Sequence, residues 1–195
     1  MKKFLLTLAL LSSTAAIAQI TVTKTAIAVE TGQTETSAGV ESSSVTVSGF
    51  LFLSNGMTIE ARNVTSQADK TDTANYGSPV SWQELGVGYS KDLGITRAYG
   101  KLFLNNYAKQ NQRYTGHAEE IGVVGKFGKS DFGYMVGYRW TNAFDNEPRL
   151  KSRNTQIRTT INYAVNKNVS VYFRNQDQEG DVVQKVNNLG VTYSF

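Results

Sequence analysis

The last seven residues of the chain, Leu189 to Phe195, alternate bulky apolar side chains with small or polar ones up to the final aromatic residue. Successive side chains of a β-strand point to opposite faces. Leu189, Val191, Tyr193 and Phe195 therefore share one apolar face of a predicted strand. The opposite face carries Asn188, Gly190, Thr192 and Ser194. This pattern predicts a closing strand with one face in an apolar medium and one in water, with the last strand of a soluble β-sandwich as the alternative.

A terminal Phe preceded by aromatic and aliphatic residues at every second position resembles the C-terminal signature of bacterial outer-membrane β-barrel proteins. The resemblance implies a Gram-negative outer membrane as the location, with membrane lipid and lipopolysaccharide as neighbours. It also implies that Tyr193 and Phe195 form an assembly signal for the barrel-assembly machinery. The expected fold class is all-β, a closed antiparallel transmembrane β-barrel.

The first eighteen residues have the pattern of a secretory signal peptide. Lys2 and Lys3 precede the apolar run from Phe4 to Leu11, and Ala16-Ile17-Ala18 offers small residues for cleavage before Gln19. The apolar run is too short for a resident transmembrane helix, the alternative interpretation. We therefore expect residues 1–18 to be a cleaved signal peptide and residues 19–195 to form the barrel domain.

The composition suits a barrel better than a helical membrane protein. Mean hydropathy is −0.32, as expected when only one face of each strand is apolar. The chain has two Pro residues, which would interrupt sheet ladders, and nineteen Phe or Tyr residues, which populate membrane interfaces. It has no Cys, so disulfides and cysteine-ligated metals are excluded.

Alternation and turn residues predict ten strands joined by alternating short and long connections. Short turns are expected near residues 55, 92, 129 and 167, and the first of them contains the hairpin signal Asn55-Gly56. Long polar loops are expected at 31–44, 65–80, 106–116, 142–152 and 175–183. The intervening strands are 20–29, 45–53, 57–64, 82–90, 95–105, 117–127, 132–141, 153–165, 169–174 and 184–195. Short periplasmic turns and longer outer loops are typical of outer-membrane barrels, and eight or twelve strands remain alternatives.

Each strand can be oriented so that its charged side chains do not point into the lipid. The charged residues that then point inward form a candidate pore lining. On 95–105, for example, Arg97 and Lys101 must point inward, because a midplane Arg or Lys on the lipid face costs about 2–4 kcal/mol. The predicted lining consists of Lys24, Glu60, Arg62, Glu84, Arg97, Lys101, Glu120, Lys126, Arg139, Arg158 and Arg174. Eight basic and three acidic residues give this set a net charge of +5.

A basic lumen attracts anions, so the sequence predicts a small porin for passive diffusion of small anionic solutes. A basic track inside a small barrel is similar to the acidic-oligosaccharide porins, although no residue roles are transferred from them. One alternative is a barrel sealed by ion pairs, because few strands enclose little space. A second is a binder such as an adhesin or receptor surface, which would act through its polar loops.

Other functional classes find little support in the residues. Outer-membrane proteases of ten strands need an Asp-x-His pair, whereas the one histidine, His117, lies in Thr115-Gly116-His117-Ala118-Glu119. The sequence has no metal-ligand spacing or phosphate loop, so we expect no catalytic residues, no cofactor and no metal. The pI near 9.2 does not indicate nucleic acid, because two lysines lie in the expected signal peptide and eight of the other eighteen cations are predicted inside the barrel.

Overall fold

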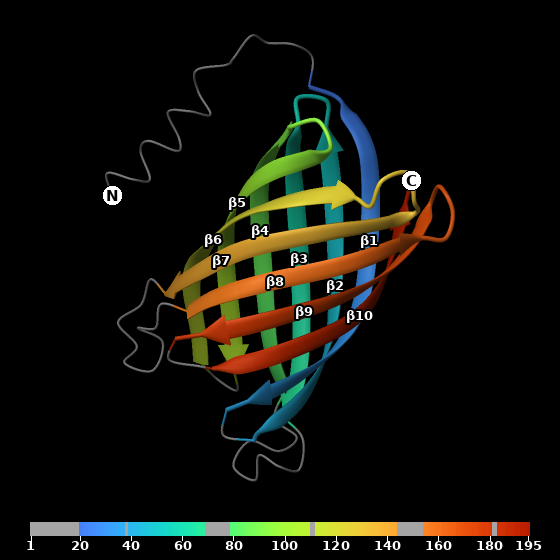
Figure 1. Cartoon of the computed structure of the whole chain (residues 1–195). Coiled ribbons are helices and arrows are strands. Elements are labelled where there is room, and N and C mark those ends of the chain that lie inside the picture. The colour runs from blue at the N-terminus through green and yellow to red at the C-terminus, as the bar shows by residue number, and fades with distance from the viewer. Residues whose placement is uncertain (1–19, 38, 69–78, 110–111, 144–153, 181–182) are drawn as a thin grey trace.

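The computed structural model is a closed barrel of ten antiparallel strands (Figure 1). It describes residues 20–37, 39–68, 79–109, 112–143, 154–180 and 183–195. The strands are β1 (Val22–Thr36), β2 (Glu41–Leu53), β3 (Met57–Ala68), β4 (Pro79–Asp92), β5 (Thr96–Lys109), β6 (Gln112–Lys126), β7 (Phe132–Ala143), β8 (Asn154–Ala164), β9 (Val169–Glu179) and β10 (Gln184–Ser194). The predicted fold class and strand number are confirmed. The expected signal peptide lies outside the described residues.

Each strand pairs with its sequence neighbours, and β1 closes the barrel against β10. The closing register runs from Ala26 opposite Ser194 to Thr36 opposite Gln184. At the end of the chain, the Phe195 amide donates to the Thr25 carbonyl at 3.0 Å, and the Asn168 side chain donates to the Ser194 carbonyl at 2.6 Å. The closure leaves no open sheet edge, which a barrel needs in lipid because unpaired backbone groups are costly there.

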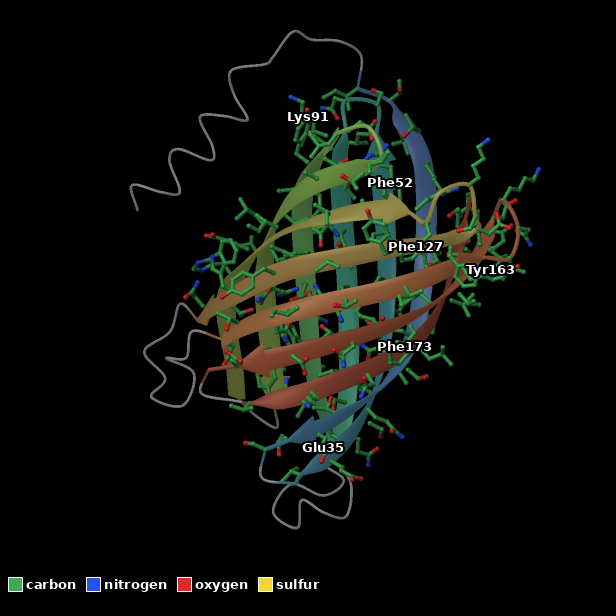
Figure 2. The ribbon with its side chains drawn as sticks, viewed as in Figure 1. Glu35, Phe52, Lys91, Phe127, Tyr163 and Phe173 are labelled. Carbon is green, nitrogen blue, oxygen red and sulfur yellow. The ribbon has the colours of Figure 1, made fainter. Side chains whose placement is uncertain are left out.

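The four short turns lie at one end of the barrel, together with both ends of the described chain (Figure 1). We call this the short-turn end and the opposite one the long-loop end. Figure 2 shows Lys91 at the short-turn end and Glu35 at the long-loop end. Among the described residues, no helix is long and apolar enough to cross a membrane.

The predicted faces agree with the observed ones along the best-patterned strands. On β7, Phe132, Val136 and Tyr138 are exposed on the outer wall, while Gly133, Gly137 and Arg139 are buried inside. On β10, Leu189, Val191 and Tyr193 are exposed, and Asn188, Gly190 and Ser194 are buried. The exposed apolar side chains form the coat that a lipid-facing wall needs.

The strands are longer than predicted at the long-loop end. The loop expected at 31–44 is mostly sheet, because β1 continues to Thr36 and β2 begins at Glu41. All described residues of the loop expected at 106–116 are likewise sheet, because β5 continues to Lys109 and β6 begins at Gln112. The other three expected loops also lose residues to the flanking strands. Polar Thr, Ser, Gln and Asn residues suggested loops, but beyond the lipid a sheet can be polar on both faces. Its backbone ladder still continues, as Gln33 opposite Ser43 shows.

Candidate functional site

Three glutamates from different strands are buried at the middle of the barrel interior. Glu30 on β1, Glu84 on β4 and Glu120 on β6 are 3%, 4% and 1% exposed. Each occupies an inward position of its strand, where alternation places every second side chain. A buried carboxylate is tolerated when cations and hydrogen-bond donors surround it, and each of these three has such partners.

Glu30 points inward from β1 and contacts side chains of β3 and β9, which are each one strand removed from β1. It accepts from Arg62 Nη2 at 3.2 Å and forms an ion pair with Arg174 Nη1, also at 3.2 Å. The Tyr172 hydroxyl donates to Glu30 Oε2 at 2.9 Å. These contacts join three strands across the interior.

Glu84 is held by two arginines. Both terminal nitrogens of Arg139 donate to the two carboxylate oxygens, which is the fork geometry that makes such pairs strong. Arg62 Nη1 donates to Glu84 Oε2 at 3.3 Å, so Arg62 bridges Glu84 and Glu30. The Arg139 guanidinium also lies 4.7 Å from the centre of the Phe103 ring, within the range of a cation–π contact.

Glu120 pairs with Arg158 Nη1 and accepts from the Tyr99 hydroxyl at 2.8 Å. Arg158 Nε donates to Gln176 Oε1 at 3.1 Å, so the contacts continue to β9. A further pair joins Lys101 Nζ to Glu60 at 2.7 Å. We call these paired side chains the waist network. Its members are Glu30, Glu60, Arg62, Glu84, Lys101, Glu120, Arg139, Arg158 and Arg174.

The waist network is close to neutral. In the described part of the chain it comprises five cations and four anions, a net charge of +1. The sequence count of +5 is therefore larger than the charge that the middle of the interior carries. The difference comes from Glu30, which the sequence reasoning omitted, and from three basic residues near the short-turn end.

Those three basic residues are Lys24, Arg97 and Lys126. All three are exposed, near the ends of their strands. Arg97 Nε pairs with Asp92 at 2.9 Å, and the two side chains are 51% and 73% exposed. Alternation gives the face that a residue occupies but not its depth. These residues are therefore placed at the short-turn mouth and not at the waist.

Glu30 was missed because the first strand was expected to stop at Val29. The inward frame of β1 continues from Ala26 and Ala28 to Glu30, and all three are buried. The alternation Ala-Ile-Ala-Val-Glu is visible in the sequence, so extending it by one residue would have found the site.

The interior is also closely packed beside the ion pairs. A Cβ atom built on Gly190 would lie 2.4 Å from the Tyr172 ring, and one built on Gly137 would lie 2.4 Å from the Tyr99 hydroxyl. These glycines leave room for the two tyrosines that donate to Glu30 and Glu120. The waist is therefore a packed constriction.

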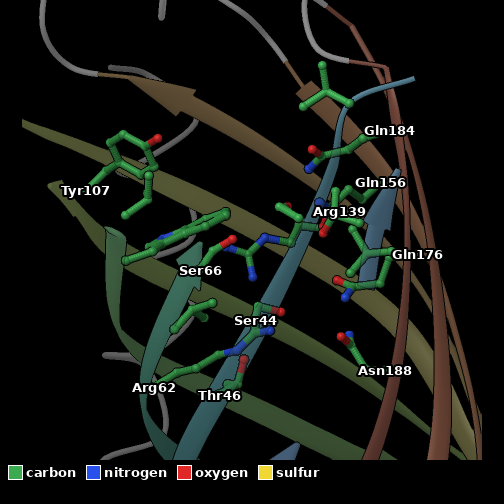
Figure 3. Close-up of a pocket in the computed structure, with 17 residues that line it drawn as sticks. Ser44, Thr46, Arg62, Ser66, Tyr107, Arg139, Gln156, Gln176, Gln184 and Asn188 are labelled. Carbon is green, nitrogen blue, oxygen red and sulfur yellow. The ribbon is translucent and has the colours of Figure 1, made fainter. Parts of the chain in front are cut away.

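A cavity of about 280 Å³ lies between the waist and the long-loop end (Figure 3). We call it the loop-side cavity. It extends from Arg62 and Arg139 of the waist network to Val40, in the connection between β1 and β2. Figure 3 shows Tyr107 and the group Gln156, Gln176 and Gln184 on opposite sides of the view.

His117 lies on the outer face of β6, away from the waist network. Its Nε2 is 3.4 Å from the Asn142 amide nitrogen. Its neighbour on the same face, Glu119, accepts from the Trp140 indole at 2.7 Å. Among the described residues, no group of three or more His, Cys, Asp or Glu side chains is arranged to hold a metal ion.

Comparison with known proteins identifies the fold and no family. No protein-family model matches the chain, and no curated protein matches its sequence. An outer membrane channel from Pseudomonas putida F1 matches with a TM-score of 0.57 and 11% identity, over 90% of this chain and 96% of that one.

Two further solved structures are similar. The β domain of the Bordetella autotransporter BrkA matches with a TM-score of 0.53 and 10% identity, over 87% of this chain and 98% of that one. The KdgM porin, solved in complex with disordered oligogalacturonate, is 15% identical over 87% of this chain and 99% of that one, with a TM-score of 0.45. The first two matches show that this chain has the fold of outer-membrane β-barrel proteins.

Proposed function

We propose that the protein is a small channel of the bacterial outer membrane, constricted at the waist network and weakly selective for small anions. The observation that carries the proposal is the placement of nine paired charged side chains inside a wall with an apolar outer surface. A charged lining is the usual means by which a channel attracts and orders ions.

Stability alone is a weak reason for such an interior. Burying ion pairs costs desolvation free energy that their attraction offsets only in part, and apolar replacements are often neutral or stabilising. The barrel could instead be filled by side chains such as Phe103 and Ala118, which are already buried there. The buried ion pairs have a functional reason, despite their desolvation cost, if water enters the waist when a solute passes.

The charge distribution supports a preference for anions. The waist network carries +1, and Lys24, Arg97 and Lys126 add positive charge near the short-turn mouth, partly offset by Asp92. This bias is weaker than the sequence count of +5 suggested. Passage would require Arg62 to exchange partners, because it links Glu30 to Glu84 across the interior.

Single-channel recording tests the proposal. Wild-type protein in a planar bilayer should show small, stepwise currents. Glu84→Gln removes the negative charge to which Arg62 and Arg139 both donate. The two arginines are then held less firmly in the waist, so we expect the open current to rise about twofold or more. Glu119→Gln on the outer wall is the matched control and should leave the current unchanged. Folding of each variant is checked by its migration on a denaturing gel before and after boiling.

A sealed barrel that acts through its loops is the second candidate, favoured by the burial of Glu84, Glu120 and Arg139. It predicts no current from folded wild-type protein or from folded Glu84→Gln at any voltage. That result would replace the channel with a binding function at the long-loop end.

A further inference from the structure

The loop-side cavity has one aromatic wall and one amide wall. Trp82 and Tyr107 lie on adjacent strands, opposite each other in the register of β4 with β5. Gln156, Gln176 and Gln184 line the other side, from β8, β9 and β10. Thr34, Ser42, Ser44, Thr46 and Ser66 add hydroxyl groups to the lining, which also includes Asn188 and the apolar side chains of Val40, Val64, Val80 and Val186.

The floor of the cavity offers hydrogen-bond donors from two arginines that already pair with buried glutamates. Both terminal nitrogens of Arg62 and of Arg139 are used by Glu30 and Glu84. The Nε atoms of both arginines and the Trp82 indole nitrogen are buried without a partner among the described residues. Buried polar groups normally have partners, so this floor suits a ligand that brings neutral acceptors.

The volume limits the ligand to a small one. Cavities for drug-sized molecules span about 300–1,000 Å³. The loop-side cavity, at about 280 Å³, falls just below that range and suits one six-membered ring with its substituents.

We propose that the loop-side cavity binds one neutral hexose ring, either as a free sugar or at the end of a glycan. The apolar C–H face of the ring would pack on Trp82, because an aromatic ring presents a large apolar surface. The hydroxyls would exchange hydrogen bonds with Gln156, Gln176 and Gln184, since amides both donate and accept. The proposal does not depend on conduction, because the cavity lies on the loop side of the waist.

Two ligand features follow from this geometry. A hexuronate should bind no more tightly than the hexose, because both arginines that line the cavity already pair with buried glutamates. Cyclohexanol, which has the ring but a single hydroxyl, should bind much more weakly, since most of the polar wall would then lose its partners.

Calorimetric titration of the folded full-length protein with glucose, galactose, N-acetylglucosamine and their methyl glycosides tests the proposal. At least one neutral hexose should bind with a dissociation constant on the order of 1 mM or lower. Binding of the methyl glycoside as well would identify the end of a glycan as a source. Binding of the free sugar alone would identify a free solute.

Matched variants locate the site. The chain has two tryptophans. Trp82→Phe should weaken binding by about fivefold or more, roughly 1 kcal/mol, whereas Trp140→Phe on the outer wall should not. Ser44→Leu fills the cavity and should abolish binding, while Ser43→Leu adds the same bulk to the outer face and should not.

The proposal is overturned if no neutral hexose binds, or if hexuronate binds tenfold more tightly than every neutral sugar. It is also overturned if folded Trp82→Phe and Ser44→Leu bind as well as wild type. These binding measurements do not require current. A folded protein that binds sugar but conducts no ions would therefore contradict the proposed function and leave this inference intact.

Discussion

At the scale of single residues, the waist depends on pairs in which a glycine makes room for a tyrosine that donates to a buried glutamate. Tyr172 lies against Gly190 and donates to Glu30, and Tyr99 lies against Gly137 and donates to Glu120. In each pair a small residue faces a large one from the next strand or from the strand beyond it, as expected in a narrow barrel. Neither half of such a pair can change size independently.

Gly190→Ala should therefore destabilise the folded barrel. The three atoms nearest to the new Cβ atom would all belong to Tyr172, the closest at 2.4 Å, and moving that side chain strains its hydrogen bond to Glu30. Overpacking of this kind costs about 1–3 kcal/mol. Urea unfolding in detergent or lipid measures the loss. Gly100→Ala is the control, because nothing lies within 4 Å of its Cβ position, and equal stability of the two variants would contradict the packing account.

The ion pairs make a separate prediction at this scale. Tyr99→Phe keeps the ring against Gly122 but removes the donor to Glu120. A hydrogen bond to a charged group contributes about 1.5–3 kcal/mol, so the free energy of unfolding should fall by that amount. Tyr163→Phe, on the exposed outer wall, should change it little. If both variants unfold at the same urea concentration, the hydrogen bond from Tyr99 to Glu120 contributes nothing measurable to stability.

At the scale of elements, the C-terminal segment packs two aromatic rings together and closes the barrel through the pairing of β10 with β1. Tyr193 and Phe195 stack edge to face with ring centres 4.8 Å apart, and the Phe195 amide bonds to β1. The last residue thus adds a hydrogen bond to the pairing of β1 with β10, which joins the first and last strands that the structure describes. This local role accompanies the proposed role of Tyr193 and Phe195 as an assembly signal.

Deleting Phe195 should lower the assembled fraction in cells. The deletion removes the backbone hydrogen bond from Phe195 to Thr25 of β1 and the contact of the Phe195 ring with Tyr193 of β10. The heat-modifiable band in outer-membrane fractions measures assembly, with Phe173→Ala on the same outer wall as the comparison. Unchanged assembly after deletion, together with a loss for Phe173→Ala, would show that the terminal residue has no special role.

At the scale of the whole molecule, the sequence predicted the ten strands and the main faces because lipid imposes a strict alternation on each strand. It could not predict strand ends at the long-loop end, where polar residues are compatible with either a sheet or a loop. The sequence also did not predict how deep in the barrel each inward-facing residue lies. Lys126 and Arg139 both occupy inward frames, yet one is exposed near a turn and the other is buried at the waist. The pairing partners, such as Arg62 with Glu30 and Glu84, depend on register across the interior, which no single strand encodes.

The reversal potential under a salt gradient is the most direct test of a charged conducting waist. At low salt it should indicate a modest anion preference, because the waist carries a net +1 and the short-turn mouth adds further cations. The preference should fade at high salt, since the Debye length falls from ~10 Å at 0.1 M to ~3 Å at 1 M. Replacing Arg139 and Arg158 with glutamine leaves the waist network with a net negative charge and should move the reversal potential to zero or beyond, towards cation preference, whereas Arg97→Gln should change it less. A cation-selective wild-type current, or one that the double variant leaves unchanged, would contradict the account.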